Sequence, residues 1–368
     1  MVNNKMRKVK ILAKTLKKPP VGIILGDQAG IGPEIVLKLL LKPKIYDLCY
    51  PLLIGNYELL FEKANRIAPD LFFNRITIET IPSDINKLFI GGIPVIDVGG
   101  DVSKVRVGEI TGESGMIAYK SIVQAYSILK KGYAKGIVMA PINKEALAKS
   151  GCGYQSEYEL FAYLAGVDEV QTVVKGGDVF RSSVIGHIPF REILSHLTTE
   201  KIIQTGVGLN NVMNLFGNTK KRIAVAALNP HGGEGGLLGT EEFEIIVPAI
   251  KKLNKMGIDT LGPYPADTIF NRAMNGDFEG VVHLYHDQGN IAMKTQMFES
   301  TAIIYTNVPF PVLSTGHGSA LDIADLGIAN PTNLSYVFTT FSEIYRNTYN
   351  EAKTRSQPTS IGGGYRLP

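Results

Sequence analysis

Cysteine, tryptophan and long apolar runs are scarce or missing in this chain. Its 368 residues include two cysteines, Cys49 and Cys152, and no tryptophan. A framework of disulfides is therefore excluded, and both thiols are predicted to be reduced. No run approaches the roughly 18 consecutive apolar residues of a membrane-spanning helix, and no apolar segment follows the N-terminal lysines as it would in a secretory signal. We expect a soluble cytoplasmic protein with no membrane partner.

The surplus of positive charge is concentrated at the N-terminus. Lysine and arginine number 38 against 34 acidic residues, a net charge of +4. Seven of those cations and no acid lie in residues 1–20, which leaves +4 − 7 = −3 for the remainder. The sequence therefore predicts a basic N-terminal arm over 1–20. Such an arm could bind an anionic surface, but a solvated terminus is favoured, so no nucleic-acid partner is expected.

Short β-branched runs followed by a glycine or proline turn and a helical pattern recur along the chain. Strands buried on both faces with helices between them indicate an α/β fold with a mostly parallel sheet, and the length favours two domains that change near residues 141–150. The predicted strands are Val21–Leu25, Tyr50–Ile54, Gly136–Ala140, Arg222–Ala227 and Gly280–Tyr285.

Three of the six histidines follow predicted strands directly: His187, His231 and His286. Ligands of α/β sheets bind outside the carboxyl ends of the strands, so these positions are candidates for a site. Three imidazoles with an open position are typical of a catalytic divalent metal. The alternative is three unrelated polar loop residues. His196 and His283, in a helix start and inside a strand, are interpreted as ordinary structural histidines.

Two lysines are further candidates: Lys144 lies just after the predicted strand that ends at Ala140, and Lys294 lies eight residues beyond His286, at the far side of its loop. Close to a dication, an ammonium group shifts toward its neutral form and can exchange protons near neutral pH. A solvated surface lysine is the alternative for either of them.

The glycine-rich loops match no nucleotide signature. Residues 26–33 (GDQAGIGP) lack the third glycine of GxGxxG and the Gly-Lys-Ser/Thr of a P-loop, and residues 232–239 miss the dinucleotide spacing by one position. The chain also contains no GxSxG elbow, so a serine hydrolase of that type is excluded.

Seven ordered motifs resemble those of the 4-hydroxythreonine-4-phosphate dehydrogenase family over about residues 21–340. They are GDQAGIGPEI (26–35), PINK (141–144), HIP (187–189), LNPHGGEGG (228–236), GPYPADTIF (262–270), YHDQG (285–289) with Lys294, and HGSALDIA (317–324).

The resemblance implies a two-domain α/β/α fold similar to isocitrate and isopropylmalate dehydrogenases. Residues 21–145 with 320–368 would form the first domain, and residues 146–319 the second, carrying most metal and substrate residues. It also implies a homodimer with the active site in the interdomain cleft near the subunit interface.

The resemblance assigns roles to individual residues as well. His187, His231 and His286 would hold one divalent metal across the dimer, with Zn, Mg, Mn, Co and Ni not distinguished. Lys294 would contact substrate, and Lys294 or Lys144 would return a proton during catalysis. Asp267, like Asp287, would orient the imidazoles. NAD or NADP would bind a loop formed by His317, Gly318, Ser319, Ala320 and Asp322.

Four substrate positions depart from the family pattern. Glu157 and Tyr158 replace a histidine and a threonine, while Ile303 and Val312 replace an asparagine and an arginine. A desolvated acid repels a phosphate, and the loss of an arginine removes a bidentate anion clamp. We therefore expect a substrate other than 4-hydroxythreonine 4-phosphate.

Together these features predict a metal- and NAD(P)-dependent dehydrogenase. It would oxidise the secondary alcohol of a 3-hydroxy acid or a related diol, with or without decarboxylation. A metal-dependent hydrolase or lyase and a non-catalytic ligand sensor on the same fold remain the alternatives.

Overall fold

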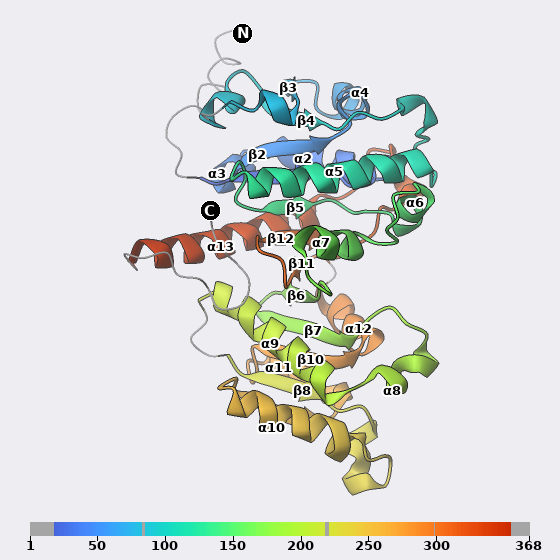
Figure 1. Ribbon diagram of the computed structural model, residues 1–368, viewed down its shortest axis with the longest axis vertical. Coiled ribbons are helices and arrows are strands. Elements are labelled where there is room, and N and C mark those ends of the chain that lie inside the picture. Colours follow the sequence, from blue (N-terminus) through green and yellow to red (C-terminus); the bar gives the residue numbers. More distant parts are fainter. Residues whose placement is uncertain (1–17, 83–84, 218–220, 298, 355–368) are drawn as a thin grey trace. The chain divides into compact units, whose positions relative to one another are not determined.

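The computed structural model describes residues 18–82, 85–217, 221–297 and 299–354, arranged in two compact units (Figure 1). Unit 1 combines the chain up to Val170 with Val308–Arg346, and unit 2 contains Gln171–Asn307 together with the segment from Asn347. Most of the predicted basic arm, residues 1–17, lies outside the described residues. Its end belongs to the fold, because Pro20 already opens the first strand.

The change of unit comes later in the chain than the proline-containing junction at 141–150 suggested. Helices α6 (Lys144–Lys149) and α7 (Glu157–Ala165) both pack on α5 (Gly112–Lys130) and so belong to unit 1. Pro141 and Leu147 are buried there, so this junction is part of a core and not a linker. The return to unit 1 at Val308 also precedes the expected position at residue 320.

Unit 1 contains a fully parallel sheet in the order β3-β4-β2-β1-β5-β12. Except for the partly exposed edge strand β3, its strands are short, mostly apolar runs whose side chains are largely buried on both faces, as expected when helices cover both sides. Their bounds are β1 Pro20–Ile24, β2 Tyr50–Gly55, β3 Phe73–Ile76, β4 Ile93–Asp97, β5 Ile137–Met139 and β12 Val312–Thr315.

Polar caps start most helices of unit 1. The side chains of Asn56, Thr111, Asn143 and Ser156 each accept a backbone N–H from the first turn of the helix that follows. The other helices are α2 Gly32–Leu40, α3 Ile45–Leu48, α4 Tyr57–Ile67 and α13 Thr332–Thr354, with the short turns η2 Ile78–Thr80, η3 Ile85–Phe89, η4 Val102–Lys104 and η8 Leu321–Ile323.

Unit 2 contains strands in the order β11-β6-β7-β10-β8-β9. The last four run parallel, whereas β6 pairs antiparallel with both β7 and β11. The strands are β6 Thr172–Gly176, β7 Val179–Ile185, β8 Ile223–Ala226, β9 Thr260–Tyr264, β10 Gly280–Tyr285 and β11 Thr301–Tyr305.

Helices cover both faces of the unit 2 sheet. The strand residues Val179, Ala224 and Val281 pack with Phe270 of α11 and Met293 of α12 on one face. Because side chains alternate along a strand, neighbours such as Phe180 and Gly280 face α9, where they meet Phe216 and Leu209. The helices are α8 Ile193–His196, α9 Thr199–Leu215, α10 Val247–Lys255, α11 Ala266–Met274 and α12 His286–Met297, with the turns η5 Phe190–Glu192, η6 Pro230–Gly236 and η7 Glu242–Ile246.

The observed architecture confirms the predicted α/β class with mostly parallel strands. Both cysteines are free, Cys49 buried and Cys152 partly exposed. Within the described ranges, no helix combines the length and apolar character needed to cross a bilayer.

Candidate active site

The three histidines of the predicted metal site leave three neighbouring parallel strands of unit 2. Strand β10 lies between β7 and β8 in the sheet. His187 comes two residues after β7, His286 opens α12 directly after β10, and His231 lies in η6 after β8. Because these strands are parallel, all three side chains start from the same edge of the sheet.

The rings of His187 and His286 lie close together. Their centroids are 4.9 Å apart and their planes are tilted by 49°. Both residues retain solvent access, since His187 is exposed and the His286 side chain keeps 40% of its surface. Two imidazoles at this separation can offer ring nitrogens to one ion between them.

Carboxylates fix the orientation of two of the three rings. Nδ1 of His286 lies 2.7 Å from Oδ1 of Asp287, and Nδ1 of His231 lies 2.7 Å from Oε1 of Glu234. A carboxylate only accepts hydrogen bonds, so each Nδ1 donates its proton. The Nε2 lone pair of the neutral ring is then left for a ligand, which is the arrangement that outer-shell carboxylates impose on metal-binding histidines.

A complete three-ligand set is not formed within one chain. Over the described ranges, no three histidine, cysteine or acidic side chains are grouped so that they could hold one ion. The structure therefore brings together two of the three predicted ligands, His187 and His286. His231 starts from the same sheet edge but is not part of such a group.

Of the other predicted site residues of unit 2, Lys294 and Asp267 are exposed and Ile303 is half-buried. Lys294 lies on α12, eight residues after His286, which corresponds to about 12 Å along the helix axis and about 80° around it. Asp267 is exposed in the first turn of α11. Ile303 is half-buried in β11, the antiparallel strand next to β6.

In unit 1 the structure brings Lys144 and Tyr158 together. The Lys144 ammonium lies 4.7 Å from the centroid of the Tyr158 ring, a favourable contact between a cation and a ring face. Lys144 opens α6 after the carboxyl end of β5, as the sequence predicted, and Tyr158 lies in the first turn of α7.

Two predicted substrate residues of unit 1 have little surface to offer a ligand. Glu157 opens α7 with 7% of its surface exposed, and Val312 is 1% exposed. Val312 also lies at the start of β12, in register with Ile137 at the start of β5, and so at the opposite end of these strands from Lys144. The sequence predicted no strand at Val312, so it could not show at which end of a strand this residue lies.

The predicted cofactor residues lie in a segment that we call the 316–331 loop, between β12 and α13. The carbonyl of Ser319 accepts the backbone N–H of Ile31 at 2.9 Å, and its hydroxyl accepts from the amide of Asn143 at 3.3 Å. A Cβ at Gly30 would lie 2.5 Å from the Ser319 carbonyl oxygen, so this position requires glycine. The GDQAGIGP segment is therefore a platform for the loop and not itself a nucleotide fingerprint.

Charged side chains of α2 and α4 hold the second half of this loop. Glu34 is fully buried, pairs with Lys38 at 2.8 Å and accepts the backbone N–H of Ala329 at 2.9 Å. Lys63 and Arg66 both bind the carboxylate of Asp325, with Arg66 at 2.7 Å. Burial alone would raise the pKa of Asp325, but the hydrogen bonds from these two cations hold it below its usual value.

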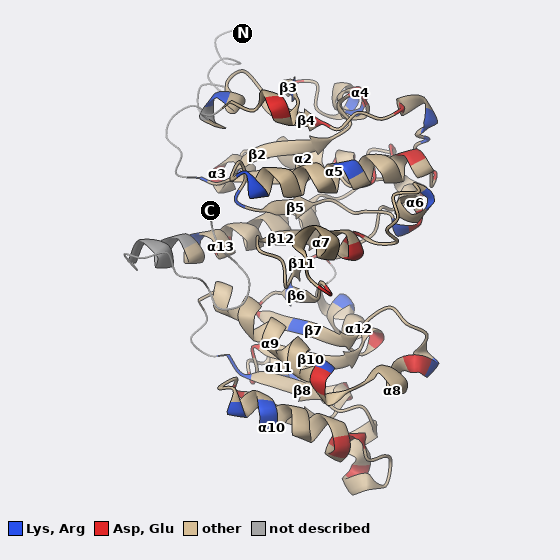
Figure 2. Ribbon diagram, in the orientation of Figure 1, with Lys and Arg blue, Asp and Glu red and all other residues tan. Residues whose placement is uncertain are grey.

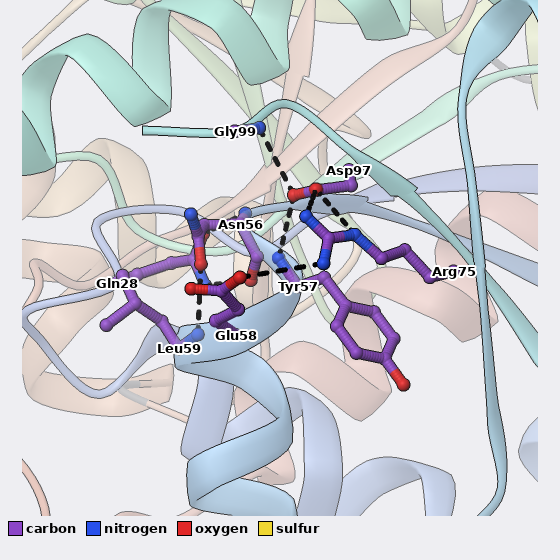
Figure 3. A network of polar contacts seen from close by, with 8 residues as sticks. All are labelled: Gln28, Asn56, Tyr57, Glu58, Leu59, Arg75, Asp97 and Gly99. Atoms are coloured by element: carbon purple, nitrogen blue, oxygen red, sulfur yellow. Dashed lines mark hydrogen bonds and ion pairs between the residues drawn. The ribbon is translucent and has the colours of Figure 1, made fainter. Parts of the chain in front are cut away.

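The carboxyl ends of β1, β2 and β4 are closed by a polar network (Figure 3). Gln28 exchanges two hydrogen bonds with the backbone of Asn56, whose side chain in turn caps Leu59. Asp97 accepts the backbone N–H groups of Tyr57 and Gly99, and Arg75 donates to its other oxygen. Side chains of the protein thus already accept the backbone N–H groups of Asn56, Tyr57 and Leu59 at the N-terminus of α4.

Close to His286, unit 2 contains the buried side chain of Arg181 next to the buried, neutral His283. Arg181 Nη1 lies 3.3 Å from Nε2 of His283 and its Nη2 donates to Asn290 at 2.6 Å. Burial, with Arg181 close by, lowers the pKa of His283 to about 3. His283 Nδ1 donates to the Tyr285 carbonyl, and Asn290 donates to the His286 carbonyl, so the network braces the start of α12. The sequence interpretation of His283 as a core histidine is confirmed.

The site also depends on residues that the sequence analysis did not select. They are Glu34, Lys63, Asp325 and Glu242, all acidic or basic groups that hold a loop. Glu242 follows a glycine-rich loop and precedes an apolar run, so its place at a helix start was a usable signal. The pairing of Lys63 with Asp325 spans 262 residues and left no local pattern.

Comparison with known proteins identifies the family. Residues 47–339 match the family model described as pyridoxal phosphate biosynthetic protein PdxA. A protein of Clostridium botulinum with the provisional name D-threonate 4-phosphate dehydrogenase is 35% identical over 320 residues, covering 86% of this chain and 94% of that protein.

Solved structures agree with this match. The 4-hydroxythreonine-4-phosphate dehydrogenase of Klebsiella pneumoniae is 30% identical with a TM-score of 0.76, over 89% of this chain and 99% of that one. The corresponding enzyme of Burkholderia phymatum is 34% identical with a TM-score of 0.74, over 89% and 98%. These relatives carry dehydrogenase names, in agreement with the predicted enzyme class. The chain belongs to the PdxA family, as the seven motifs predicted.

Proposed function

We propose that this protein is a divalent-metal- and NAD(P)-dependent dehydrogenase of the PdxA family that oxidises the secondary alcohol of a hydroxy acid. The observation that carries the proposal is the pair of adjacent imidazoles, His187 and His286, at neighbouring strand ends. The Asp287 carboxylate leaves Nε2 of His286 free to bind a metal.

The donor set fits a borderline transition metal such as zinc better than magnesium, because neutral imidazole nitrogens are its ligands. His187 and His286 would hold the ion, and His231, with its Nδ1 occupied by Glu234, would complete the set. A bound dication would lower the pKa of a coordinated alcohol, and it would stabilise the enolate if the 3-keto acid formed by hydride transfer then loses CO₂.

The chain's own residues would orient the substrate and move protons. Asp287 and Glu234 keep each Nδ1 protonated, so the rings cannot turn to present the wrong nitrogen. Lys294 lies exposed on α12, and its Nζ would donate a proton to the enolate that remains when the oxidised 3-keto acid loses CO₂. Lys144 rests over the Tyr158 ring and is suited to hold a substrate anion.

For the nicotinamide cofactor we propose the 316–331 loop. Support comes from its rigid attachment to the 26–34 segment and to α2 and α4, which holds a loop of small residues in one conformation. His317, Gly318, Ser319, Ala320 and Asp322 would line it. Dehydrogenase chemistry requires such a hydride acceptor.

The substrate that we propose is a phosphorylated 3-hydroxy acid other than 4-hydroxythreonine 4-phosphate, of the D-threonate 4-phosphate class. The named relatives support a phosphorylated four-carbon acid. These two substrates differ at carbon 2, which carries an amino group in one and a hydroxyl in the other. Glu157 is 7% exposed, so its carboxylate has little surface from which to contact a bound phosphate.

A substrate panel tests the proposal directly. Purified protein is stripped of metal, reloaded with Zn²⁺, and assayed at 340 nm with NAD or NADP on 4-hydroxythreonine 4-phosphate, D-threonate 4-phosphate and D-threonate. We expect metal-dependent reduction with D-threonate 4-phosphate as the best substrate, and its loss in H286A. H196A, which changes an exposed histidine of α8, is the matched control. Turnover without a nicotinamide would instead indicate a hydrolase or lyase, and ligand-induced stabilisation without any turnover would indicate a sensor.

We further propose that the active enzyme is a homodimer in which His231 of one subunit completes the site of the other. In that case a mixture of inactive H231A and H286A proteins forms heterodimers with one intact site. Random re-association then restores about 25% of wild-type activity, since half of the dimers are mixed and each has one working site of two. No recovery on mixing would place all three ligands in one subunit.

A further inference from the structure

The loop that carries His231 adopts an unusual left-handed turn. Five consecutive residues, His231–Gly235, have φ between 46° and 81°, and two of them, His231 and Glu234, are not glycine. L-residues with a Cβ avoid this region, so the conformation needs support from outside the turn. The turn also brings Nδ1 of the His231 ring to the Glu234 carboxylate, so the conformation of the turn affects how this ring is oriented.

Glu242 supplies that support. Its side chain is 1% exposed. Oε1 accepts the backbone N–H groups of Leu228 and Asn229 at 2.9 and 2.8 Å, and Oε2 accepts the Asn229 side-chain amide at 2.9 Å. Burial alone would raise the pKa of Glu242, but these donors hold it below its usual value. The buried Glu242 carboxylate thus fixes Leu228 and Asn229, which lie just ahead of the turn.

Glu242 itself opens a π-helical turn, η7, that leads into α10. Such turns are rare and occur mostly at functional sites. Here Glu242 is buried while Phe243 and Glu244 are exposed. Figure 2 shows acidic residues at this end of the helical segment and lysines at the far end of α10, a distribution that suits the helix dipole. The exposed Glu244 carboxylate contributes to this distribution, whereas the Glu242 carboxylate binds the backbone and side chain of the preceding loop.

We propose that Glu242 is a positioning residue for His231, which fixes the left-handed turn through Leu228 and Asn229 and so presents Nε2 of His231 to the metal. This inference rests on the proposed metal-binding role of His231. Glu242 acts through the backbone and makes no contact with the reacting atoms, so its removal changes where the ligand lies and leaves the ligand's chemistry intact.

The test compares Glu242→Gln with Glu244→Gln, which removes the same charge from an exposed position of the same turn. In E242Q an NH₂ group replaces one carboxylate oxygen, so one hydrogen-bond acceptor is lost. We expect the Kd for Zn²⁺, measured by competition with a chromophoric chelator, to rise about 10- to 100-fold in E242Q and to change less than twofold in E244Q. Saturating Zn²⁺ should then restore kcat in E242Q.

A second measurement follows the loop without metal. Leu237 and Leu238 are 84% and 49% exposed just after the turn, so chymotrypsin can cleave there. We expect cleavage of E242Q at this loop to be at least fivefold faster than that of E244Q. If E242Q does not fold, Asn229→Ala removes the side-chain amide that donates to Glu241 and Glu242 and keeps both backbone hydrogen bonds to Glu242, and we expect the same two effects at a smaller size.

The variant H231A distinguishes the metal-binding role of His231 from the positioning role of Glu242. If H231A binds Zn²⁺ as tightly as the wild type, the metal role of His231 is wrong and the positioning proposal falls with it. If H231A loses affinity while E242Q keeps wild-type affinity and wild-type cleavage, only the positioning proposal is overturned.

Discussion

Asp325→Asn is the most informative single substitution in the 316–331 loop. Asparagine tolerates the left-handed backbone of this position, φ 62°, so the change removes the charge and leaves the turn. The side chain of Lys63 is 3% exposed and that of Asp325 is 20% exposed. Removing one partner of a buried ion pair costs about 3–5 kcal/mol, because the other charge stays buried without compensation.

The asparagine oxygen still accepts a hydrogen bond from Lys63, so we expect the lower end of that range, about 3 kcal/mol. For a unit of this size each kcal/mol lowers the melting temperature by about 2–4 °C, which gives about 6–12 °C for D325N. Circular dichroism at pH 7 measures this change. The 53% exposed Arg66 forms a surface pair, so R66A should have little effect by comparison.

A double variant and the pH dependence of stability test the role of Asp325 further. Removing the buried cation as well, in Lys63→Met with D325N, should recover most of the lost stability. The folded-state pKa of Asp325 is depressed, so its contribution is complete above the unfolded value of about 3.9 and disappears as the pH falls through the folded value. The difference between D325N and wild type should therefore shrink toward pH 3. A D325N protein as stable as wild type at pH 7, or no recovery in the double variant, would refute the argument.

Three further tests are independent of D325N. Asp287→Asn removes the carboxylate from Nδ1 of His286 and should weaken Zn²⁺ binding about 10- to 100-fold. Gly115→Ala places a Cβ 1.9 Å from the Ala146 carbonyl oxygen and should destabilise unit 1 by about 2–3 kcal/mol in urea unfolding, whereas Gly186→Ala meets nothing within 4 Å and should be near neutral. Burial raises the pKa of Asp27, so the folded state keeps this proton at pH values where the unfolded state has lost it. Wild-type stability in urea titrations should therefore fall as the pH rises from the unfolded value of about 3.9 toward the raised folded value, Asp27→Asn should flatten this dependence, and an unchanged slope would contradict it.

Local sequence patterns predicted the elements that place the histidines. Apolar runs ending in polar residues indicated β7, β8 and β10. Because ligands bind at the carboxyl ends of such strands, the sequence predicted that His187 and His286 lie close together, and their rings are adjacent in the structure. The antiparallel hairpin of β6 and β7 was not predicted, although Gly177-Asp178 between two apolar runs is a hairpin signal. The three-ligand metal site, the bound cofactor and the cytoplasmic location stay predictions.

Contacts between distant segments could not be predicted from the sequence. Glu34 reaches Ala329, and Lys63 reaches Asp325, across a chain that leaves unit 1 and returns to it. A single acidic side chain looks like a solvated surface group until the fold shows that it is buried. The unit boundary was misplaced for the same reason, because only the packing of α6 and α7 on α5 assigns them to unit 1.

The interrupted path of the chain through unit 1 has a consequence for biosynthesis. Strand β5 pairs with β1 on one side and with β12 on the other, and all of residues 171–307 is translated between β5 and β12. In the nascent chain, β5 can pair with β1, but its other edge has no partner until β12 has emerged from the ribosome. An open strand edge is a template for wrong pairing, so slow translation of the intervening segment would lengthen the period in which the nascent chain depends on chaperones.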